Sequence, residues 1–378
     1  MLPGEPDLPE AILAPDGQAV NRLFHWLCQR SDTRLAGEYQ EVLKQIQLDW
    51  FSRRRGSLHC PDCGGQHLIR KGWRSREITT SRGKIAMNVI QASCKSCGRT
   101  FRPLNAALGL PTSRRLLDEV ASHAAFLGTQ MSFARAASIL QRLTQGGVSS
   151  EGVRRIVAQQ AAKLQLSSPV AGQTVLVDAT KVKAGHKERG ESVYLAVTAE
   201  AGPVQHGRPT CQKRLVHLHV GSSVELKHRL KAAGVTHVVH DGGENLEECV
   251  PHLQRCRWHL GHQLKHYLWQ DGVPHTFRGQ FQDTMTRIVS DPIQGRKRFR
   301  RWQTNLAAMG LKTAAEHLKN AEKEAFTYTK EPFSYIDTSP LEREMRELNR
   351  RADIGARWSP KGLENVLKLM FHQRLNET

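Results

Sequence analysis

Two short apolar stretches, Thr174-Val175-Leu176-Val177-Asp178 and Val235-Thr236-His237-Val238-Val239-His240-Asp241, decide the fold of this chain. Both are rich in β-branched residues and too short for a buried helix, so they predict buried strands. Each stretch ends on an aspartate. A carboxylate at the end of a buried strand is costly unless a cation pairs with it. Asp178 and Asp241 are therefore candidates for a shared cation-binding site.

A third acidic residue, Glu342, lies on a charged helix predicted over 341–351. Three converging carboxylates would raise one another's pKa unless divalent cations lay between them. Such a cluster suits phosphoryl transfer by two Mg²⁺ or Mn²⁺ ions about 4 Å apart. Taken singly, each acid has an ordinary explanation, because Asp241-Gly242 is turn chemistry and acids on charged helices are usually solvated. The prediction depends on the three acids together.

The chain is strongly basic, with 55 Lys and Arg against 36 Asp and Glu and a formal net charge of +19 in 378 residues. This excess favours a polyanionic partner, with double-stranded DNA the first candidate. No apolar run of about 18 residues is present, which argues against a membrane span. The first fifteen residues carry three acids and no Lys or Arg, so they do not read as a targeting peptide. We expect a cytoplasmic, prokaryotic protein that associates with the nucleoid when bound to DNA.

Four of the eight cysteines form two knuckles, Cys60-x2-Cys63 and Cys94-x2-Cys97, each followed by glycine and separated by 30 residues. This spacing predicts one structural Zn²⁺ ion in a zinc ribbon over 58–104. Disulfides and a redox pair are the alternatives, and the cytosol disfavours the first. Four cysteine ligands leave no open position, so this zinc would fold the module and perform no chemistry.

The segment 105–166 changes to an alanine-rich helical pattern. Ser132 caps one predicted helix, Gly146-Gly147 ends it, and Ser149 or Ser150 begins a second helix. This order is typical of a helix-turn-helix, although any three-helix bundle shares it. Two basic clusters outside this segment also have the composition of phosphate-binding surfaces. The residues expected to contact DNA are Arg53, Arg54, Arg55, Arg154, Arg155, Arg298, Arg300, Arg301 and Trp302.

The remaining segment, 170–378, is predicted to be an α/β catalytic core. Three strand-like stretches are followed by a helix over 224–233 and then by the strand that carries Asp241. This is the order of an RNase-H-like mixed sheet, in which the first and fourth strands are neighbours. A basic, helix-rich stretch at about 262–335 then predicts an all-α insertion. The expected domains are 1–57 (helical), 58–104 (zinc ribbon), 105–166 (helix-turn-helix) and 170–378 (core with insertion).

Residues from about 58 to 378 resemble the DDE transposases of bacterial insertion sequences, and among them the Mutator-like and hAT-like enzymes. The resemblance is carried by Asp178, Asp241, Cys256-x2-His259, the helix of Glu342, and Trp358-Ser359-x2-Gly362. It departs at Ala179-Thr180, where many relatives have Gly or Glu. The resemblance implies that the three acids hold two Mg²⁺ or Mn²⁺ ions for DNA cleavage and strand transfer. It also implies terminal inverted repeats and target DNA as partners, and a homo-oligomer on DNA.

Several assignments have alternatives. The resemblance implies that Cys256 and His259 pack the insertion against the core, whereas their spacing also fits half of a second zinc site. Trp302 is either a stacking platform for a flipped nucleotide or a core residue. Glu364 and Asp337 are the runners-up to Glu342. For the whole chain, the alternatives are a sequence-specific DNA-binding regulator without catalysis and an RNase-H-like nuclease.

Overall fold

The computed structural model describes residues 40–53, 55–80, 83–105, 110, 116–144, 147–184, 190–205, 207–354 and 357–376. Most of the predicted helical region 1–57 therefore lies outside the described residues. The chain divides into two compact units, one formed by 1–123 and 137–148 and the other by 124–136 and 149–378. This division passes through α2 (Asp118–Gln130) and α3 (Phe133–Thr144), both within the predicted segment 105–166.

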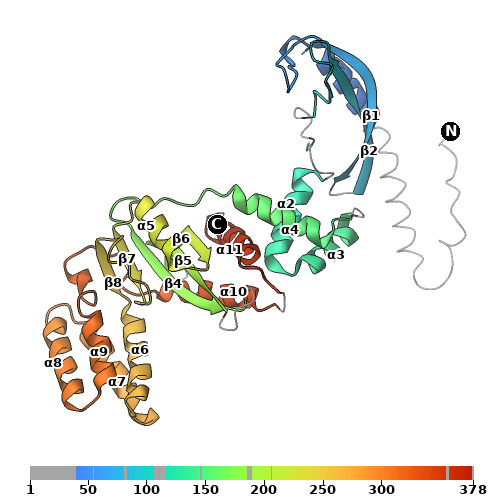
Figure 1. The fold of residues 1–378 in the computed structure, drawn as a ribbon. Coiled ribbons are helices and arrows are strands. Elements are labelled where there is room, and N and C mark those ends of the chain that lie inside the picture. Colours follow the sequence, from blue (N-terminus) through green and yellow to red (C-terminus); the bar gives the residue numbers. More distant parts are fainter. Residues whose placement is uncertain are drawn as a thin grey trace, which may run out of the picture. The chain divides into compact units, whose positions relative to one another are not determined.

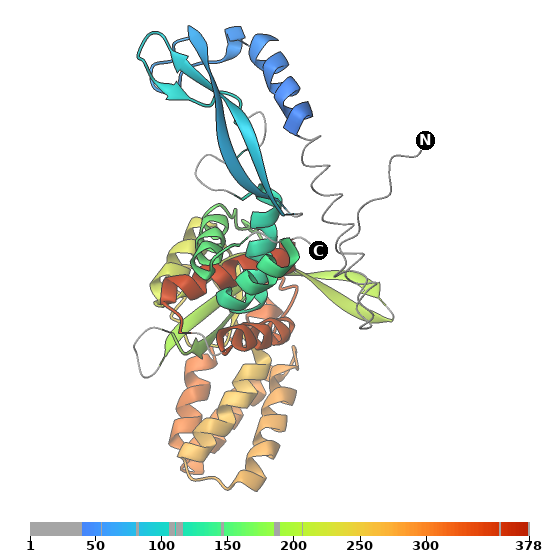
Figure 2. The ribbon, with the colours of Figure 1, turned by 90° about the vertical axis from the view of Figure 1, so that its right-hand side faces the viewer.

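The first unit contains an antiparallel sheet of β1 (Leu68–Thr80), β2 (Gly83–Cys94) and the short β3 (Thr100–Phe101). β1 and β2 form the long curved ribbon seen in Figure 2. A helix over 40–53 precedes the 3-10 turn η2 (Arg55–Ser57). Gln47 on that helix accepts from the Ile90 amide at 3.0 Å and donates to the Asn88 carbonyl at 2.9 Å. These bonds satisfy backbone groups of β2 that have no strand partner.

The second unit is built on a five-stranded mixed sheet in the order β6-β5-β4-β7-β8. Its strands are β4 (Thr174–Val182), β5 (Glu191–Gln205), β6 (Arg208–Val220), β7 (His237–His240) and β8 (His252–Arg255). The first three in spatial order pair antiparallel, whereas β7 pairs parallel with both β4 and β8. The helix α5 (Ser223–Ala232) connects β6 to β7, as expected for a parallel crossover. The mixed α/β character predicted for this half is confirmed.

Helices cover both faces of this sheet (Figure 1). Val175 and Val177 of β4 pack with Val238 and with Leu226 of α5, because alternate strand residues face the same side. α11 (Pro360–Asn376) packs against β6 and against α4 (Ser150–Ala162), and α10 (Glu342–Ala352) packs against β4. The sheet is therefore buried, which explains the continuous apolar character of its central strands.

Between β8 and α10 lies a helical insertion, as predicted. It contains α6 (Arg257–Gln270), α7 (His275–Val289), α8 (Gly295–Ala308) and α9 (Lys312–Ala321), followed by the 3-10 turns η3 (Thr327–Thr329) and η4 (Ser339–Leu341). Leu260, Leu264 and Leu268 recur at helical spacing and pack with Phe299 in a core of the insertion's own. The bundle lies beside β7 and β8 in Figure 1. Among the residues described, no helix is both long and apolar enough to cross a membrane.

Arg351, on α10, is the largest side chain fully buried in the described structure. Its guanidinium donates to the carbonyls of Gly128, Thr129 and Met131 at 2.7, 2.6 and 3.0 Å. These carbonyls belong to the end of α2, which lacks helical partners for them. The guanidinium also lies 4.8 Å from the ring centre of Trp358. Arg351 therefore fastens α10 to the end of α2.

We expect Arg351→Lys to lower the free energy of unfolding by about 3 kcal/mol, because an ammonium cannot reach three carbonyls in a planar fork and would leave buried acceptors unpaired. Urea denaturation of the full chain measures the change. Arg350→Lys is the matched control: its side chain is 65% exposed and, among the described residues, forms an ion pair with Glu347 alone, so a change of at most about 0.5 kcal/mol is expected. Equal midpoints for both variants would contradict the capping role.

Candidate metal sites

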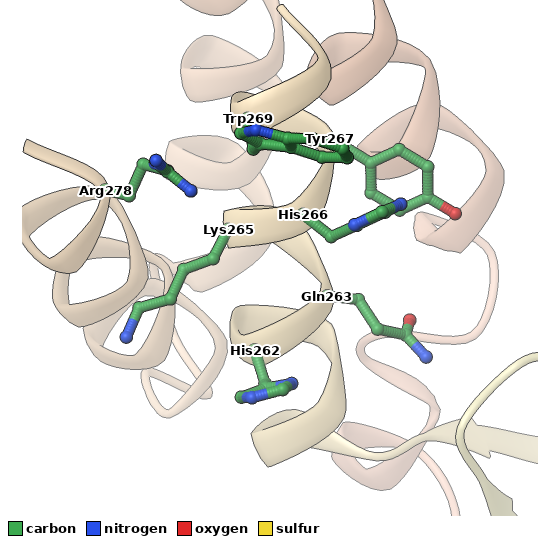
Figure 3. A pocket seen from close by; sticks show the side chains of 7 residues that line it. All are labelled: His262, Gln263, Lys265, His266, Tyr267, Trp269 and Arg278. Carbon is green, nitrogen blue, oxygen red and sulfur yellow. The ribbon is translucent and has the colours of Figure 1, made fainter. Parts of the chain in front are cut away.

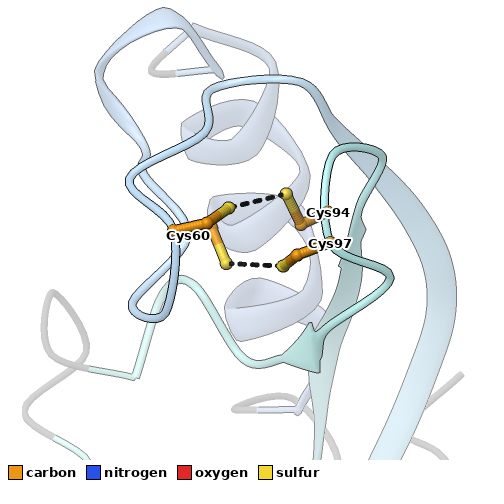
Figure 4. Close-up of side chains that lie close together, drawn as sticks. Cys60, Cys94 and Cys97 are labelled. Carbon is orange, nitrogen blue, oxygen red and sulfur yellow. Dashed lines mark hydrogen bonds between the residues drawn. The ribbon is translucent and has the colours of Figure 1, made fainter.

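The four knuckle cysteines converge on one point in the first unit. The sulfurs of Cys60 and Cys97 lie 3.6 Å apart, as do those of Cys63 and Cys94, and all four lie within 4.8 Å of one another. Figure 4 shows Cys60 facing Cys94 and Cys97 across the gap between the two loops. Tetrahedral zinc with Zn–S bonds of about 2.3 Å requires sulfur separations of about 3.8 Å. The cluster therefore fits Zn²⁺, in agreement with the prediction.

The knuckle loops also prepare the sulfurs for a cation. Gly64 and Gly98 have φ of 69° and 75°, which allows each loop to fold back toward its cysteine. The Cys97 amide donates to the Cys94 sulfur and helps to lower the pKa of that thiol to about 6. Although the Gly65 amide favours ionisation of Cys63, the neighbouring thiols of Cys97 and Cys94 raise its pKa to about 12. Four adjacent thiolates therefore need a bound cation to coexist.

We expect Cys97→Ser to release one equivalent of zinc per chain and to unfold the ribbon, because ligation in such modules contributes on the order of 10 kcal/mol to folding. Atomic emission on the dialysed full chain measures the metal, and circular dichroism follows the ribbon. Cys211→Ser is the control, since Cys211 lies outside the cluster on β6. An unchanged zinc content in Cys97→Ser would show that zinc does not bind at this cluster.

The strand register brings Asp178 and Asp241 together. β4 and β7 pair Thr174 with His237 and Leu176 with Val239, and continuing this register by two residues sets Asp178 opposite Asp241. Asp241 follows the last residue of β7, as predicted. The prediction that Asp178 also ends its strand was wrong: β4 continues to Val182 by pairing with β5. Asp178 lies where β7 stops, so one side of β4 loses its partner beside the carboxylate.

Glu342 is the first residue of α10, on the helix that packs against β4. Asn349 lies two turns further along, on the same face as Glu342. Its side-chain oxygen accepts from the Thr180 hydroxyl at 3.3 Å. That bond holds this face of α10 against β4, two residues beyond Asp178. The negative charge of Glu342 also contributes to the raised pKa of Asp178, so the two carboxylates interact despite their separation in sequence.

Electrostatic interactions connect the three predicted acids. The Asp178 side chain is 6% exposed, and its burial raises the pKa of the carboxyl to about 6. The charge of His259 opposes this increase, whereas Asp241 and Glu342 add to it. Among the described residues, the three acids do not form a group with all ligand atoms within 4.8 Å, unlike the cysteines. The three acids therefore interact through their charges, without the close convergence that the cysteines have.

A fourth carboxylate, Glu244, was not predicted. It is buried, its Oε2 has no hydrogen-bond partner among the described residues, and burial with the charges of Asp241 and Asp178 raises its pKa to about 7. The sequence indicates it only through its position three residues after Asp241, from which Gly242 and Gly243 separate it. Gly242 has φ of 95°, and a Cβ there would lie 0.7 Å from Arg255 Nη1, so glycine is required. The loop returns Glu244 to the cluster.

Cys256 and His259 have well-defined partners. The Cys256 sulfur accepts from the amide and hydroxyl of Thr338 at 3.2 and 3.4 Å, and burial raises the pKa of its thiol. The same hydroxyl is hydrogen-bonded to His259 Nδ1 at 3.0 Å. Thr338 follows the helices of the insertion, so these contacts join the chain that enters the insertion to the chain that leaves it. They favour the packing interpretation, and they orient His259 beside Asp178.

The two runners-up for the third acid have other partners. Glu364 is bound by Lys361, Lys368 and His219 at 2.8–2.9 Å, and despite its burial these bonds, those of the lysines above all, lower its pKa to about 2. Asp337 accepts from the Ser339 amide at 3.1 Å and pairs with Arg257 at 3.5 Å. Neither is among the main causes of the raised pKa of Asp178, whereas Glu342 is, which favours Glu342.

Most of the predicted DNA-contacting arginines are exposed but paired. Arg154 and Arg155 both bind Glu151, at 2.6 and 2.8 Å, on α4, which Ser149 caps. The other pairs are Arg53 with Asp49, Arg298 with Asp291, and Arg300 with Glu322, at 2.6, 3.1 and 2.5 Å. Arg301 is exposed, whereas Arg54 and the Arg55 side chain lie outside the described residues. Surface pairs of this kind are weak enough for a phosphate to replace the acid.

Trp302 packs against the core of the insertion, with its ring 5.7 Å from that of Phe281, and its Nε1 is buried. These contacts favour the alternative that it is a core residue. A better aromatic surface lies on α6. A pocket of about 600 Å³ beside that helix is lined by cationic and aromatic side chains, which Figure 3 shows on α6 together with Arg278 from the neighbouring helix α7. Its lining residues are His262, Gln263, Lys265, His266, Tyr267, Trp269 and Arg278.

We expect Asp178→Asn to stabilise the metal-free protein at pH 8 by about 2 kcal/mol, because the ionised carboxyl is disfavoured in the folded state. The folded pKa, about 6, lies above the ordinary value of 3.8. Stability is therefore lost as pH rises through this window, and the difference between variant and wild type should vanish near pH 4. Thermal melts from pH 4 to 8 in EDTA measure it. Mg²⁺ should stabilise only the wild type, and a variant that is less stable at pH 8 would contradict the assignment.

No model of a known protein family matches the chain, and no curated protein matches it. Its function is therefore inferred from the carboxylate cluster, the cysteine cluster and the excess of positive charge.

Proposed function

We propose that this chain is a DDE-type DNA transposase that binds the ends of a mobile element and catalyses metal-dependent DNA cleavage and strand transfer. The observation that carries the proposal is the register of β4 and β7, which sets Asp178 opposite Asp241, with Glu342 close enough to raise the Asp178 pKa. Burying a group of like charges at the edge of a sheet costs free energy unless bound cations offset the repulsion.

The arrangement of the second unit supports an RNase-H-like core. Three antiparallel strands, a crossover helix and two parallel strands give the spatial order β6-β5-β4-β7-β8. The first and fourth strands of that series are neighbours, as this fold requires. The helical insertion separates the strand of Asp241 from the helix of Glu342, which is the position it has in the Mutator-like and hAT-like enzymes that the sequence resembles.

The residues of the site suit a two-step phosphoryl transfer. Two divalent cations held by Asp178, Asp241 and Glu342 would activate the attacking oxygen and stabilise the leaving oxygen. Water first breaks a phosphodiester at the element end, leaving a 3′-hydroxyl and a 5′-phosphate. The 3′-hydroxyl then attacks a target phosphodiester, so one bond forms as one breaks and no external energy source is needed. The buried setting of Asp178 and Glu244 keeps bulk water from screening the carboxylates.

The charge of the chain supports DNA as the substrate. A net charge of +19 attracts phosphates, and the cationic and aromatic pocket on α6 begins one turn after His259, which faces Asp178. Lys265 and Arg278 could bind phosphates there, and Trp269, which is 57% exposed, could stack on a base. The zinc ribbon and α4 remain the proposed end-binding elements, with the inverted repeats as their ligand. Joining two ends would require a homo-oligomer on DNA.

The test uses duplexes made from the DNA on either side of the coding sequence, ending in a free 3′-hydroxyl, with a supercoiled plasmid as target and Mg²⁺. Asp178→Asn, Asp241→Asn and Glu342→Gln should each reduce strand transfer by on the order of 100-fold or more. Glu347→Gln is the matched control, since Glu347 lies on the same helix and pairs with Arg350 at the surface. It should retain activity.

Other outcomes would redirect the proposal. Cleavage without joining would indicate an RNase-H-like nuclease, and specific binding without either reaction would indicate a DNA-binding regulator. Full activity in Glu342→Gln with none in Glu364→Gln would move the third ligand to α11.

A further inference from the structure

A second group of potential ligands lies at the other end of β7. His237 begins β7 and His252 begins β8, and the parallel register pairs them directly. Their rings stack with centres 4.7 Å apart. Glu331, which follows η3 at the end of the helical insertion, faces both rings. The three side chains therefore come from two adjacent strands and from the segment that returns from the insertion.

The ligand atoms have the spacing of a metal site. Glu331 Oε2 lies 3.8 Å from His237 Nε2, and Oε1 lies 3.5 Å from His252 Nδ1. All three ligand atoms fall within 4.8 Å of one another. A tetrahedral zinc ion with bonds of about 2.1 Å separates its ligands by about 3.4 Å. The observed pairs are slightly too long for direct hydrogen bonds and close to the separation that an intervening ion requires.

The burial of His237 supports a metal site independently of these distances. Its side chain is 8% exposed, and its buried Nε2 has no hydrogen-bond partner among the residues that the structure describes. Its other nitrogen, Nδ1, lies 2.9 Å from the Thr236 hydroxyl. That hydroxyl oxygen also accepts from the Gly172 amide at 3.2 Å and has a second lone pair for an Nδ1 proton. With Nδ1 protonated, Nε2 presents a free lone pair toward Glu331, which is the tautomer that metal-binding histidines adopt.

The surroundings of His237 hold its ring in place. The His252 ring stacks on it, and Phe333 lies edge-on to it with ring centres 5.1 Å apart. A buried imidazole nitrogen without a hydrogen-bond partner costs free energy, and a bound metal ion would supply the missing partner.

We propose that His237, His252 and Glu331 bind a zinc ion, with water as the fourth ligand. Two imidazoles and one carboxylate are a donor set that suits Zn²⁺ and does not suit Mg²⁺ or Ca²⁺, which prefer oxygen ligands. His252 and Glu331 are partly exposed, which leaves room for the water on the outer side. The proposal does not rest on the transposase function.

The zinc would fasten the end of the insertion to the sheet. Three residues after Glu331, the Ser334 amide donates to the Thr174 hydroxyl at the start of β4, at 2.9 Å. The zinc would strengthen this attachment where the chain turns toward Thr338 and Glu342. A four-residue strand spans about 13 Å, so this site is distinct from the carboxylates at the other end of β7.

The test measures zinc in the full chain after dialysis against metal-free buffer. Wild type should retain two equivalents, and Glu331→Gln, which keeps the size of the side chain, should retain one. His252→Ala should also retain one. His123→Ala is the matched control, because His123 is an exposed histidine near Glu119 on a helix, and it should retain two. Cys97→Ser should lose only the ribbon zinc, so the two losses should add in the double variant.

A second readout separates ligation from packing. Cobalt replacing the zinc in Cys97→Ser should give weak visible bands of a nitrogen and oxygen site, which Glu331→Gln should abolish. Limited proteolysis near residue 331 should become faster when this metal is removed. A single zinc in wild type with no second binding event in a zinc titration to about 100 µM would overturn the proposal, since site affinities of structural zinc are far tighter. Two equivalents in both Glu331→Gln and His252→Ala would overturn it equally.

Discussion

Repulsion among carboxylates around Asp178 is the constraint on which the second unit depends. Desolvation and the charges of Asp241 and Glu342 all disfavour the ionised form of this residue. Several features hold the acids together despite this cost: the parallel pairing of β4 with β7, the bond between Thr180 and Asn349, and the attachment of α10 to α2 by Arg351. Burying like charges costs free energy, and bound cations would recover it.

β7 connects this site to the rest of the unit although it is only four residues long. Asp241 follows its last residue, and His237 begins it. Between them, His240 is buried and lies 3.1 Å from Glu324 at the end of the helical core, where Arg255 of β8 also approaches. The chain that returns from the insertion is therefore attached near both ends of β7, by Thr338 near the carboxylates and by the bond from Ser334 to Thr174 at the opposite end. Movement of the insertion relative to the sheet would disturb both attachments.

The sequence predicted the parts of this arrangement that depend on local residue patterns. Cysteine spacing located the first metal site, and apolar, β-branched runs located the strands of Asp178 and Asp241. Features that depend on tertiary contacts were not predictable. The continuation of β4 beyond Asp178 depends on pairing with β5, and β8 has no signal apart from its partner. Trp302 is partly buried because it packs beside Phe281 against the core of the insertion. Glu244 had a local signal, since Gly242 and Gly243 allow the loop to return.

The fourth carboxylate changes how the catalytic site would fill. Without metal, Asp178 and Glu244 have pKa values of about 6 and 7, so near neutral pH the cluster retains protons that offset part of its repulsion. Two divalent cations would bring four positive charges to four carboxylates and displace those protons. Binding of the cations is then linked to proton release, so their affinity should rise with pH up to about 7 and level off above it. Because Glu244 is buried beside Asp241 and its Oε2 lacks a partner among the described residues, in the proposed reaction it would either ligate an ion or accept a proton from the attacking water.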